Sequence, residues 1–493
     1  MSSSVVARLP SGCTIDVDLT PPSFCLRWPR PQLTAGQARA RVASTLNKPA
    51  GEIRLINPTT QLALADDATI PKGEVQVVLL TIDVDAQRDA EARILQTLGE
   101  HDMDNLTTRT GLFFTAVEMS ALPESFAKLQ ALQRLVLVEA MLTKLPDSFC
   151  QLKSLQELTL QYNQLSGLPE RFGELVALRV LQLDHNLLSK LPESFGQLTN
   201  LSILFLGSNK LEKLPDSFGQ LVSLTTLMLN NNKLTEVIED IGNLVNLGTL
   251  NLSFNQLSIL PDGFMQLVAL EGLYIGGNQL STLPDFVDLR FLSAHDNRLT
   301  TLPQSIGRLT ALQKLNLSGN ELCMLPDNIG ELTNLEELDL TSNQIEELPD
   351  SIVDLGNLVY LRIANNRLRQ LPRRFGQLKR LQFLIVSDNQ LTTLPFCFRQ
   401  CSALQSLHLH NNPLTTLPQN LGRIAQLRTL LLDKSQMSAI PDSLINREFQ
   451  ILALKPREKS EYGDLLSTCC CTSVFAVLSA GRPLHGWRTM GFY

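Results

Sequence analysis

Apolar and polar positions follow one another in a pattern that returns every 23 residues along most of this chain. Around a recurrent asparagine the pattern is L-x-x-L-x-L-x-x-N-x-L-x-x-L-P, as between Leu201 and Pro215. The asparagines are Asn163, Asn186, Asn209, Asn232, Asn255, Asn278, Asn297, Asn320, Asn343, Asn366, Asn389 and Asn412. The step from Asn278 to Asn297 is only 19 residues, so one repeat has lost four.

The same frame extends beyond these asparagines in both directions. Val117 and Ala140 take the asparagine position before Asn163, and Ser435 takes it after Asn412. This extension gives 15 repeats over residues 106–445. In all but one of them a proline stands six residues after that position, and the exception is Ile238. Self-similarity of this kind predicts a solenoid, in which neighbouring repeats stack on one another.

Each part of the repeat predicts a local structure. The L-x-L alternation has a period of two, so each repeat should add one short strand to a parallel sheet on the concave side. The asparagine amide can pair with backbone groups of its own and the neighbouring repeat, and its loss should cost about 1–3 kcal/mol. Leu-Pro predicts an extended return, and S-F-G-Q-L or N-I-G-E-L then turns the chain back on the convex side.

These repeats resemble the leucine-rich repeats of intracellular proteins with a 23-residue period. The segment L-P-x-S-F-G-x-L-x-x-L is most similar to the Ras-group leucine-rich-repeat proteins and related signalling scaffolds. The resemblance covers about two thirds of the chain. It implies a curved α/β horseshoe that binds proteins without catalysing a reaction, with a small GTPase or a phosphatase as the leading class of partner.

The first 82 residues lack the repeat. Apolar runs at Val5–Leu9 and Cys13–Leu19 flank a turn and predict a hairpin, and residues 35–46 predict a helix that begins after Thr34. Two further strands are expected at Ile53–Ile56 and Val75–Leu80. This order resembles a ubiquitin-like β-grasp domain with an insertion at Pro21–Pro31 and without a conjugatable Gly-Gly end. The resemblance implies a docking module whose apolar patch includes Ile56 and Val78.

The domain boundaries follow from these patterns. Residues 1–82 form the ubiquitin-like domain, 83–105 a linker and N-terminal cap helix, 106–447 the repeats, and 448–493 a C-terminal cap and tail. The cap helix is expected at Asp83–Glu100, where it would cover the open edge of the first repeat. The tail contains a short apolar run with three adjacent cysteines that are candidates for S-acylation and hence membrane association. These cysteines are Cys469, Cys470 and Cys471.

Strand direction also predicts which side chains face the concave side. The residue between the two closely spaced leucines of a repeat, and the residue two before it, should point away from the core. Large apolar groups at such positions are typical anchors of protein interfaces, and charged groups there would set the orientation of a partner. The predicted binding residues are Ile203, Phe205, Met228, Tyr274, Phe291, Glu337, Asp339, Tyr360, Arg362 and Phe383.

Composition narrows the possible functions. A net charge of −7 gives no basic footprint for nucleic acid, and the sequence contains no run long enough for a transmembrane helix. We expect a cytoplasmic protein, because the nine cysteines are irregularly placed and the start lacks the features of a secretory signal. Aromatic residues make up only 5%, and we expect leucine to fill an interior with no room for large rings.

The sequence lacks several common motifs of enzyme active sites. The chain has no phosphate-binding G-x-x-x-x-G-K-[ST] loop, no dinucleotide-binding G-x-G-x-x-G and no H-E-x-x-H. His408 and His410 lie two apart on one predicted strand, and Asp433 is the best candidate for a third ligand, but no complete metal site is evident. Cys397 and Cys401 flank a convex turn and favour a packing role over redox chemistry. We therefore expect no catalytic residue, no cofactor and no metal.

Two classes of function remain open. The first is a monomeric, non-enzymatic scaffold in signal transduction, which binds a partner protein on the concave face and docks a second through the N-terminal domain. The second is an adaptor for ubiquitin-dependent turnover, in which the repeats select the substrate and the ubiquitin-like domain engages the degradation machinery. The sequence names no partner for either class.

Overall fold

The computed structural model describes residues 86–117 and 119–445 and the backbone of seven further strands. These residues belong to two compact units, Met1–Leu98 with Glu118–Ser120, and Gly99–Val117 with Ala121–Tyr493. The second unit contains the repeats.

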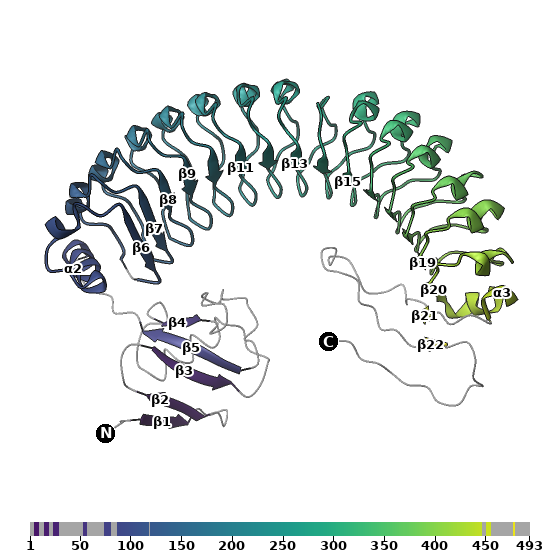
Figure 1. Cartoon of the computed structure of the whole chain (residues 1–493), viewed down its shortest axis with the longest axis horizontal. Helices are drawn as coiled ribbons and strands as arrows, with labels where there is room; N and C mark the ends of the chain where they lie inside the picture. The colour runs from purple at the N-terminus through teal and green to yellow at the C-terminus, as the bar shows by residue number, and fades with distance from the viewer. Residues whose placement is uncertain are drawn as a thin grey trace. The chain divides into compact units, whose positions relative to one another are not determined.

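The repeats form a solenoid with 15 parallel strands along the inner side of an arc (Figure 1). Neighbouring strands pair in register at the repeat spacing, so that Leu204 lies beside Leu181 and Leu227. The strands are β6 (Gly111–Thr115), β7 (Arg134–Val138), β8 (Glu157–Thr159), β9 (Val180–Gln182), β10 (Ile203–Phe205), β11 (Thr226–Met228), β12 (Thr249–Asn251), β13 (Gly272–Tyr274), β14 (Phe291–Ser293), β15 (Lys314–Asn316), β16 (Glu337–Asp339), β17 (Tyr360–Arg362), β18 (Phe383–Ile385), β19 (Ser406–His408) and β20 (Thr429–Asp433). The predicted parallel sheet is confirmed.

The outer side of the arc carries short 3-10 helices, which turn the chain back as the S-F-G-Q-L pattern predicts (Figure 1). They are η2 (Met103–Leu106), η3 (Glu124–Lys128), η4 (Asp147–Gln151), η5 (Phe172–Glu174), η6 (Glu193–Gln197), η7 (Asp216–Gln220), η8 (Glu239–Asn243), η9 (Asp262–Gln266), η10 (Gln304–Arg308), η11 (Asp327–Glu331), η12 (Asp350–Asp354), η13 (Phe375–Gln377), η14 (Phe396–Gln400), η15 (Leu421–Arg423) and η16 (Lys434–Ala439). Their glycines are needed for close packing. A Cβ on Gly196 would lie 2.3 Å from the carbonyl oxygen of Ser217 in the next turn.

The short repeat lacks its 3-10 helix. No helix stands between β13 and β14 within the described repeats, whereas each neighbouring pair of strands is joined through one. Leu283, Phe286 and Leu289 remain buried in this repeat. The four missing residues therefore shorten the convex turn and leave the core layer intact.

The interior contains large rings, so the prediction that a 23-residue coil excludes them is wrong. Among the residues whose side chains the structure describes, nine phenylalanines are fully buried, and most of them come from the convex turns. Phe172, Phe195 and Phe218 stack nearly parallel, with ring centroids 6.1 and 6.2 Å apart. The convex layer has room for them because several turns contribute one inward ring, and the rings of adjacent turns stack on one another. Other turns contribute an isoleucine at this position, as with Ile241 and Ile306, so the aromatic content stays low.

The asparagines form the predicted ladder. Asn232 Nδ2 donates to the carbonyl oxygen of Leu206 at 2.9 Å and to that of Leu229 at 3.0 Å. Its Oδ1 accepts from the backbone N–H of Leu211 at 3.0 Å. The same bonds recur at the other asparagines. Each buried amide thereby joins its own repeat to the preceding one.

The last repeat ends this ladder with a residue the frame does not predict. Ser435 occupies the asparagine position, but the buried Gln436 makes the contacts. Its Nε2 donates to the carbonyl oxygen of Asn412 at 2.7 Å, and its Oε1 accepts from the N–H of Asp433 at 2.9 Å. The longer glutamine side chain, one residue later, satisfies the backbone where the repeat pattern stops.

Beyond the last repeat, α3 (Asp442–Ile445) follows η16. Strand β21 (Gln450–Leu454) adds to the sheet in parallel beside β20, and β22 (Val477–Leu478) pairs with β21 in antiparallel fashion. The other tail residues, including Cys469, Cys470 and Cys471, lie outside the described residues.

In the first unit the described strands are β1 (Ser4–Arg8), β2 (Thr14–Asp18), β3 (Ser23–Trp28), β4 (Ile53–Ile56) and β5 (Gly73–Leu79). The predicted hairpin of β1 and β2 is present, and β5 pairs in antiparallel fashion with both β3 and β4. The segment predicted as an insertion contains β3. These pairings do not support the β-grasp prediction, which requires the last strand to run parallel to the first. The helix expected at residues 35–46 lies outside the described residues.

Helix α2 (Ala86–Leu98) forms inside the predicted cap segment, and Ile94 on its apolar stripe is fully buried. Its role as a cap on the first repeat stays a prediction.

Candidate protein-binding surface

All ten predicted binding residues lie on the exposed face of strands β10 to β18. The residue between them on each strand is a buried leucine, as with Leu204 between Ile203 and Phe205. The ten side chains are half-buried or exposed, and Tyr274 is 36% exposed. Strand geometry thus separates core from surface within three residues. The role of these residues in partner binding stays a proposal.

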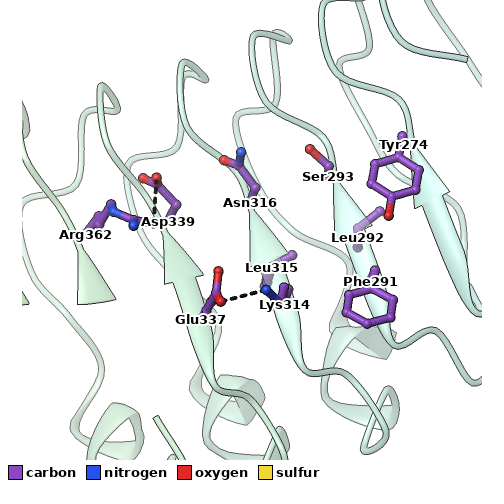
Figure 2. A pocket seen from close by; sticks show the side chains of 10 residues that line it. All are labelled: Tyr274, Phe291, Leu292, Ser293, Lys314, Leu315, Asn316, Glu337, Asp339 and Arg362. Atoms are coloured by element: carbon purple, nitrogen blue, oxygen red, sulfur yellow. Dashed lines mark hydrogen bonds and ion pairs between the residues drawn. The ribbon is translucent and has the colours of Figure 1, made fainter. Parts of the chain in front are cut away.

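A shallow hollow of about 220 Å³ lies on this face between β13 and β17. Figure 2 shows Tyr274 and Phe291 on one side of it and charged side chains on the other. Lys314 Nζ donates to Glu337 Oε1 at 2.7 Å, and this bond raises the pKa of the Lys314 ammonium. Sequence reasoning named Glu337 but missed Lys314, although it lies in the same column as Phe291.

Arg362 is held over the same face by two contacts. Its guanidinium lies 3.7 Å from Asp339 Oδ2 and 5.8 Å from the centre of the Tyr360 ring. Tyr360 in turn stacks on Phe383 of the next strand, with ring centroids 4.6 Å apart and planes within 5°. This flat aromatic pair, with a fixed cation beside it, offers apolar area at a low cost in side-chain entropy.

A second apolar group lies on β10 and β11. Phe205 and Met228 stand beside each other in register, next to Ile203. The side chains between this group and the hollow are smaller and polar, as at Thr249 and Asn251 of β12. The concave face therefore carries two apolar groups, one on β10–β11 and one on β17–β18. The hollow adjoins the group on β17–β18.

The residue before each ladder asparagine has a left-handed backbone, which sequence reasoning missed. Most of these residues are Asn, Asp, Ser, His or Gly, but Tyr162 and Phe254 have φ of 56° and 57°. A bulky side chain is rare in this region. Tyr162 is 45% exposed and stacks on His185, and Phe254 is 51% exposed. The signal was available in the sequence, because small polar residues recur at this position.

Two adjoining blocks of opposite charge also escaped the sequence analysis. Residues 315–361 contain ten acidic residues and no Lys or Arg. Residues 362–387 contain seven basic residues and no Asp or Glu. The blocks meet between the repeats of β16 and β17. In the segments that follow these two strands, Arg369 NH2 lies 3.3 Å from Glu346 Oε2. A count of charge repeat by repeat, rather than over the whole chain, would have found them.

The three residues considered as metal ligands contact different neighbours. His408 Nε2 lies 3.0 Å from Ser406 Oγ, His410 Nε2 lies 3.8 Å from Asp388 Oδ2, and Asp433 Oδ2 accepts from the N–H of Asn411. Burial, together with nearby His410, lowers the pKa of His408 to about 4. Within the described residues, no three His, Cys, Asp or Glu side chains gather as a metal site would require.

Cys150 and Cys401 are packing residues. Cys401 is fully buried, and burial raises the pKa of its thiol to about 12, while burial raises that of Cys150 to about 11. Cys397 Sγ donates to the carbonyl oxygen of Arg373 at 2.9 Å. A thiol with a raised pKa is a poor nucleophile, in agreement with the packing role predicted for Cys401.

For the remaining predicted site residues, the structure describes the backbone alone or does not describe the residue. Ile56 and Val78 lie on β4 and β5, where Val78 pairs with Arg54, and their side chains are outside the description. None of the helices in the described part of the chain is long and apolar enough to cross a membrane.

The parallel strands, the asparagine ladder and the variable concave face together define a repeat solenoid of the protein-binding class. The chain belongs to the leucine-rich-repeat family. The family of leucine-rich repeat regions matches residues 154–262 and 315–384, and two further leucine-rich-repeat families match residues 379–422 and 120–165. No curated protein matches the sequence.

Three solved structures illustrate the similarity. A leucine-rich-repeat protein of Leptospira interrogans is 38% identical, with a TM-score of 0.60, over 64% of this chain and 84% of its own. The plant peptide hormone receptor RGFR1, in complex with RGF2, is 28% identical with a TM-score of 0.58, over 70% of this chain and 62% of its own. YopM, a leucine-rich effector protein from Yersinia pestis, is 29% identical with a TM-score of 0.51, over 70% of this chain and 92% of its own.

Proposed function

We propose that this chain is a non-enzymatic binding protein whose concave strand face holds a partner protein. The observation that carries the proposal is the pair of apolar groups, on β10–β11 and β17–β18, on a sheet whose core positions are filled by leucine. Large side chains such as Phe205 and Tyr360 contribute nothing to the core from that face. Anchors of this kind, with charged groups between them, are the usual composition of protein interfaces.

The hollow between β13 and β17 supports the same function. Its ion pairs hold Lys314 and Arg362 in fixed positions, so a partner would meet a preorganised surface. Among the similar structures, the plant receptor is in complex with RGF2, which is a binding role for the same fold. We further propose that the protein acts as a scaffold in intracellular signalling, with a small GTPase or a phosphatase as its partner, as the Ras-group resemblance implies.

The test uses the full chain as bait in an extract of its native cells, with quantitative mass spectrometry of what is captured. Phe205→Ala combined with Tyr274→Ala should release the main captured protein and leave the melting temperature nearly unchanged, because neither ring is part of the core. Ile259→Ala combined with Val268→Ala is the matched control, since these apolar side chains are exposed outside the strands.

Two results would count against the proposal. If the Phe205 and Tyr274 variant captures the same proteins as the unmodified chain, the partner binds elsewhere. If it lowers the melting temperature by many degrees, these side chains belong to the core and the assignment of faces is reversed.

A further inference from the structure

The repeats provide an internal comparison of one convex position. The residue after the proline of a repeat, or after Ile238 in the one repeat that lacks it, stands at the start of the convex turn, and in most repeats it begins the 3-10 helix. A carboxylate at such a position is favoured by the free N–H groups of the turn. Through the first eleven repeats this residue is acidic, with the single exception of Gln304. The acidic residues are Glu124, Asp147, Glu170, Glu193, Asp216, Glu239, Asp262, Asp285, Asp327 and Asp350.

The next two repeats break this rule. Arg373 takes the position, followed by a second arginine at 374, and in the next repeat Phe396 takes it. Pro395, before Phe396, has φ −64° and ψ 144°, close to the −64° and 149° of Pro349 before Asp350. The backbone is therefore the same and only the side chain differs. Phe396 is 77% exposed, more than any other large apolar side chain in the described solenoid.

Basic side chains surround Phe396. Arg373, Arg374, Lys379 and Arg399 are exposed, and with Phe396 they form what we call the basic convex patch. Two contacts show that its turns adjoin. Cys397 Sγ reaches the carbonyl oxygen of Arg373, and Lys379 Nζ donates to that of Gln400 at 3.2 Å.

In the described part of the chain, no carboxylate forms an ion pair with the arginines of this patch. Between residues 355 and 441 the only acidic residues are Asp388 and Asp433, against eleven Lys and Arg. Asp388 follows β18 and Asp433 is the last residue of β20, and both are hydrogen-bonded to Asn411. Within the described residues, Arg373, Arg374 and Arg399 take part in no ion pair.

We propose that the basic convex patch docks the protein on an anionic lipid bilayer. The patch lies on the convex side of the solenoid. Two hollows of the described residues lie elsewhere, one on the concave face and one beside it at Glu347 and Arg369. A bilayer can meet an outward curve, and it accepts a protruding phenylalanine among arginines and lysines. A folded acidic partner would need a complementary recess.

Charge along the solenoid would orient the docked protein. The acidic convex row from Glu124 to Asp350 is repelled by an anionic surface, so only the C-terminal repeats approach the bilayer. The concave face remains open to a partner, and docking is therefore separate from the proposed binding function. Because β21 extends the sheet beside β20, the tail starts at the same end. S-acylation at Cys469, Cys470 and Cys471, as predicted, would add a second anchor.

The test is sedimentation of the unacylated full chain, made in bacteria, with vesicles of phosphatidylcholine containing about 30% phosphatidylserine. Arg373→Asp combined with Arg374→Asp should reduce the bound fraction by roughly tenfold or more, since each basic group near the surface is worth about fivefold. Lys210→Asp combined with Lys213→Asp makes the same change in net charge away from the patch and should bind like the unmodified chain. Phe396→Ser should weaken binding more modestly.

The arginine variant is expected to fold normally, because Arg373→Asp introduces the acidic residue that most other repeats have at this position. Its melting temperature should not fall. The proposal is overturned if phosphatidylcholine vesicles bind the chain equally well, or if the Lys210 and Lys213 control loses as much binding as the arginine variant. Binding to soluble polyglutamate without binding to vesicles also overturns it and assigns the patch to an acidic protein.

Discussion

The two sides of strands β10 to β12 differ in how their residues change from repeat to repeat. On the buried side, Leu204 is followed at the repeat spacing by Leu227 and Leu250. On the concave side, Phe205 is followed by Met228 and Asn251. The buried residues repeat because each packs against a copy of itself, and the concave residues vary because no such neighbour constrains them. From this difference we expect binding specificity to reside on the concave side.

The largest effect is expected where this buried repetition is broken. Phe195→Ala should cost about 3–5 kcal/mol in the free energy of unfolding, because the ring is fully buried between two stacked neighbours. Chemical denaturation measures it. Phe396→Ala removes the same side chain from an exposed position on another convex turn and should cost less than about 0.5 kcal/mol. Equal losses would refute the distinction between the two positions.

The ladder asparagines should come next. Asn232→Ala leaves the carbonyl oxygens of Leu206 and Leu229 and the N–H of Leu211 without their side-chain partner. The loss should be about 1–3 kcal/mol in the free energy of unfolding, because these groups stay buried. Asn231→Gly is the matched control, since Asn231 is exposed and its left-handed backbone suits glycine. A variant at 232 as stable as this control would exclude the ladder as a source of stability.

Acid should weaken the C-terminal repeats through His408. Its pKa is lowered to about 4 in the folded chain, against ~6.5 when unfolded. The unfolded state therefore takes up a proton first, and stability falls as pH drops from about 6.5 to 4, by of order 2–3 kcal/mol. His408→Gln should remove this part of the pH dependence. Asp433 also titrates, because burial raises its pKa, and its effect on the pH dependence of stability has the opposite sign. Both proteins contain Asp433, so its contribution cancels when the pH dependence of the variant is subtracted from that of the unmodified chain.

The smallest effect concerns a bulky side chain on a left-handed backbone. Phe254→Asn should stabilise the chain by about 0.5–1 kcal/mol, because asparagine adopts this conformation at lower cost. The gain is limited because the Phe254 ring packs against the His295 ring, with ring centroids 5.8 Å apart, and covers Gly277. Thermal melting measures the change. A loss greater than 1 kcal/mol would show that the ring's contacts outweigh its backbone strain.

Sequence periodicity could predict the parts of the fold that repeat. The spacing of Leu204 and Asn209 from their counterparts fixes strand, register and ladder, and strand alternation then gives the concave residues. It could not predict the convex ring stack, because Phe195 is buried by its copies in adjacent turns rather than by anything in its own repeat. Gln436 was missed for the opposite reason, since it acts where the pattern stops. The first unit has no repeat. The hairpin of β1 and β2 was predicted there, but the pairing of β5 with β3 and β4 was not.

The concave site was also predicted only in part. Phe205 and Tyr274 follow from strand register, but the preorganisation of Arg362 depends on Asp339 and Tyr360 of two strands, which no single repeat reveals. Lys314 was missed because its role depends on its bond to Glu337 of the next strand, which the pattern of a single repeat does not show.

The central claim is that the concave strand face, and no other surface, holds the partner protein. It is tested most directly by placing a photo-crosslinking amino acid at Met228 on β11 and, separately, at Val268, which is exposed outside the strands. Crosslinking in native cells followed by mass spectrometry should give one dominant partner from position 228 and none from position 268. The same partner crosslinked at 268, with none at 228, would contradict the account.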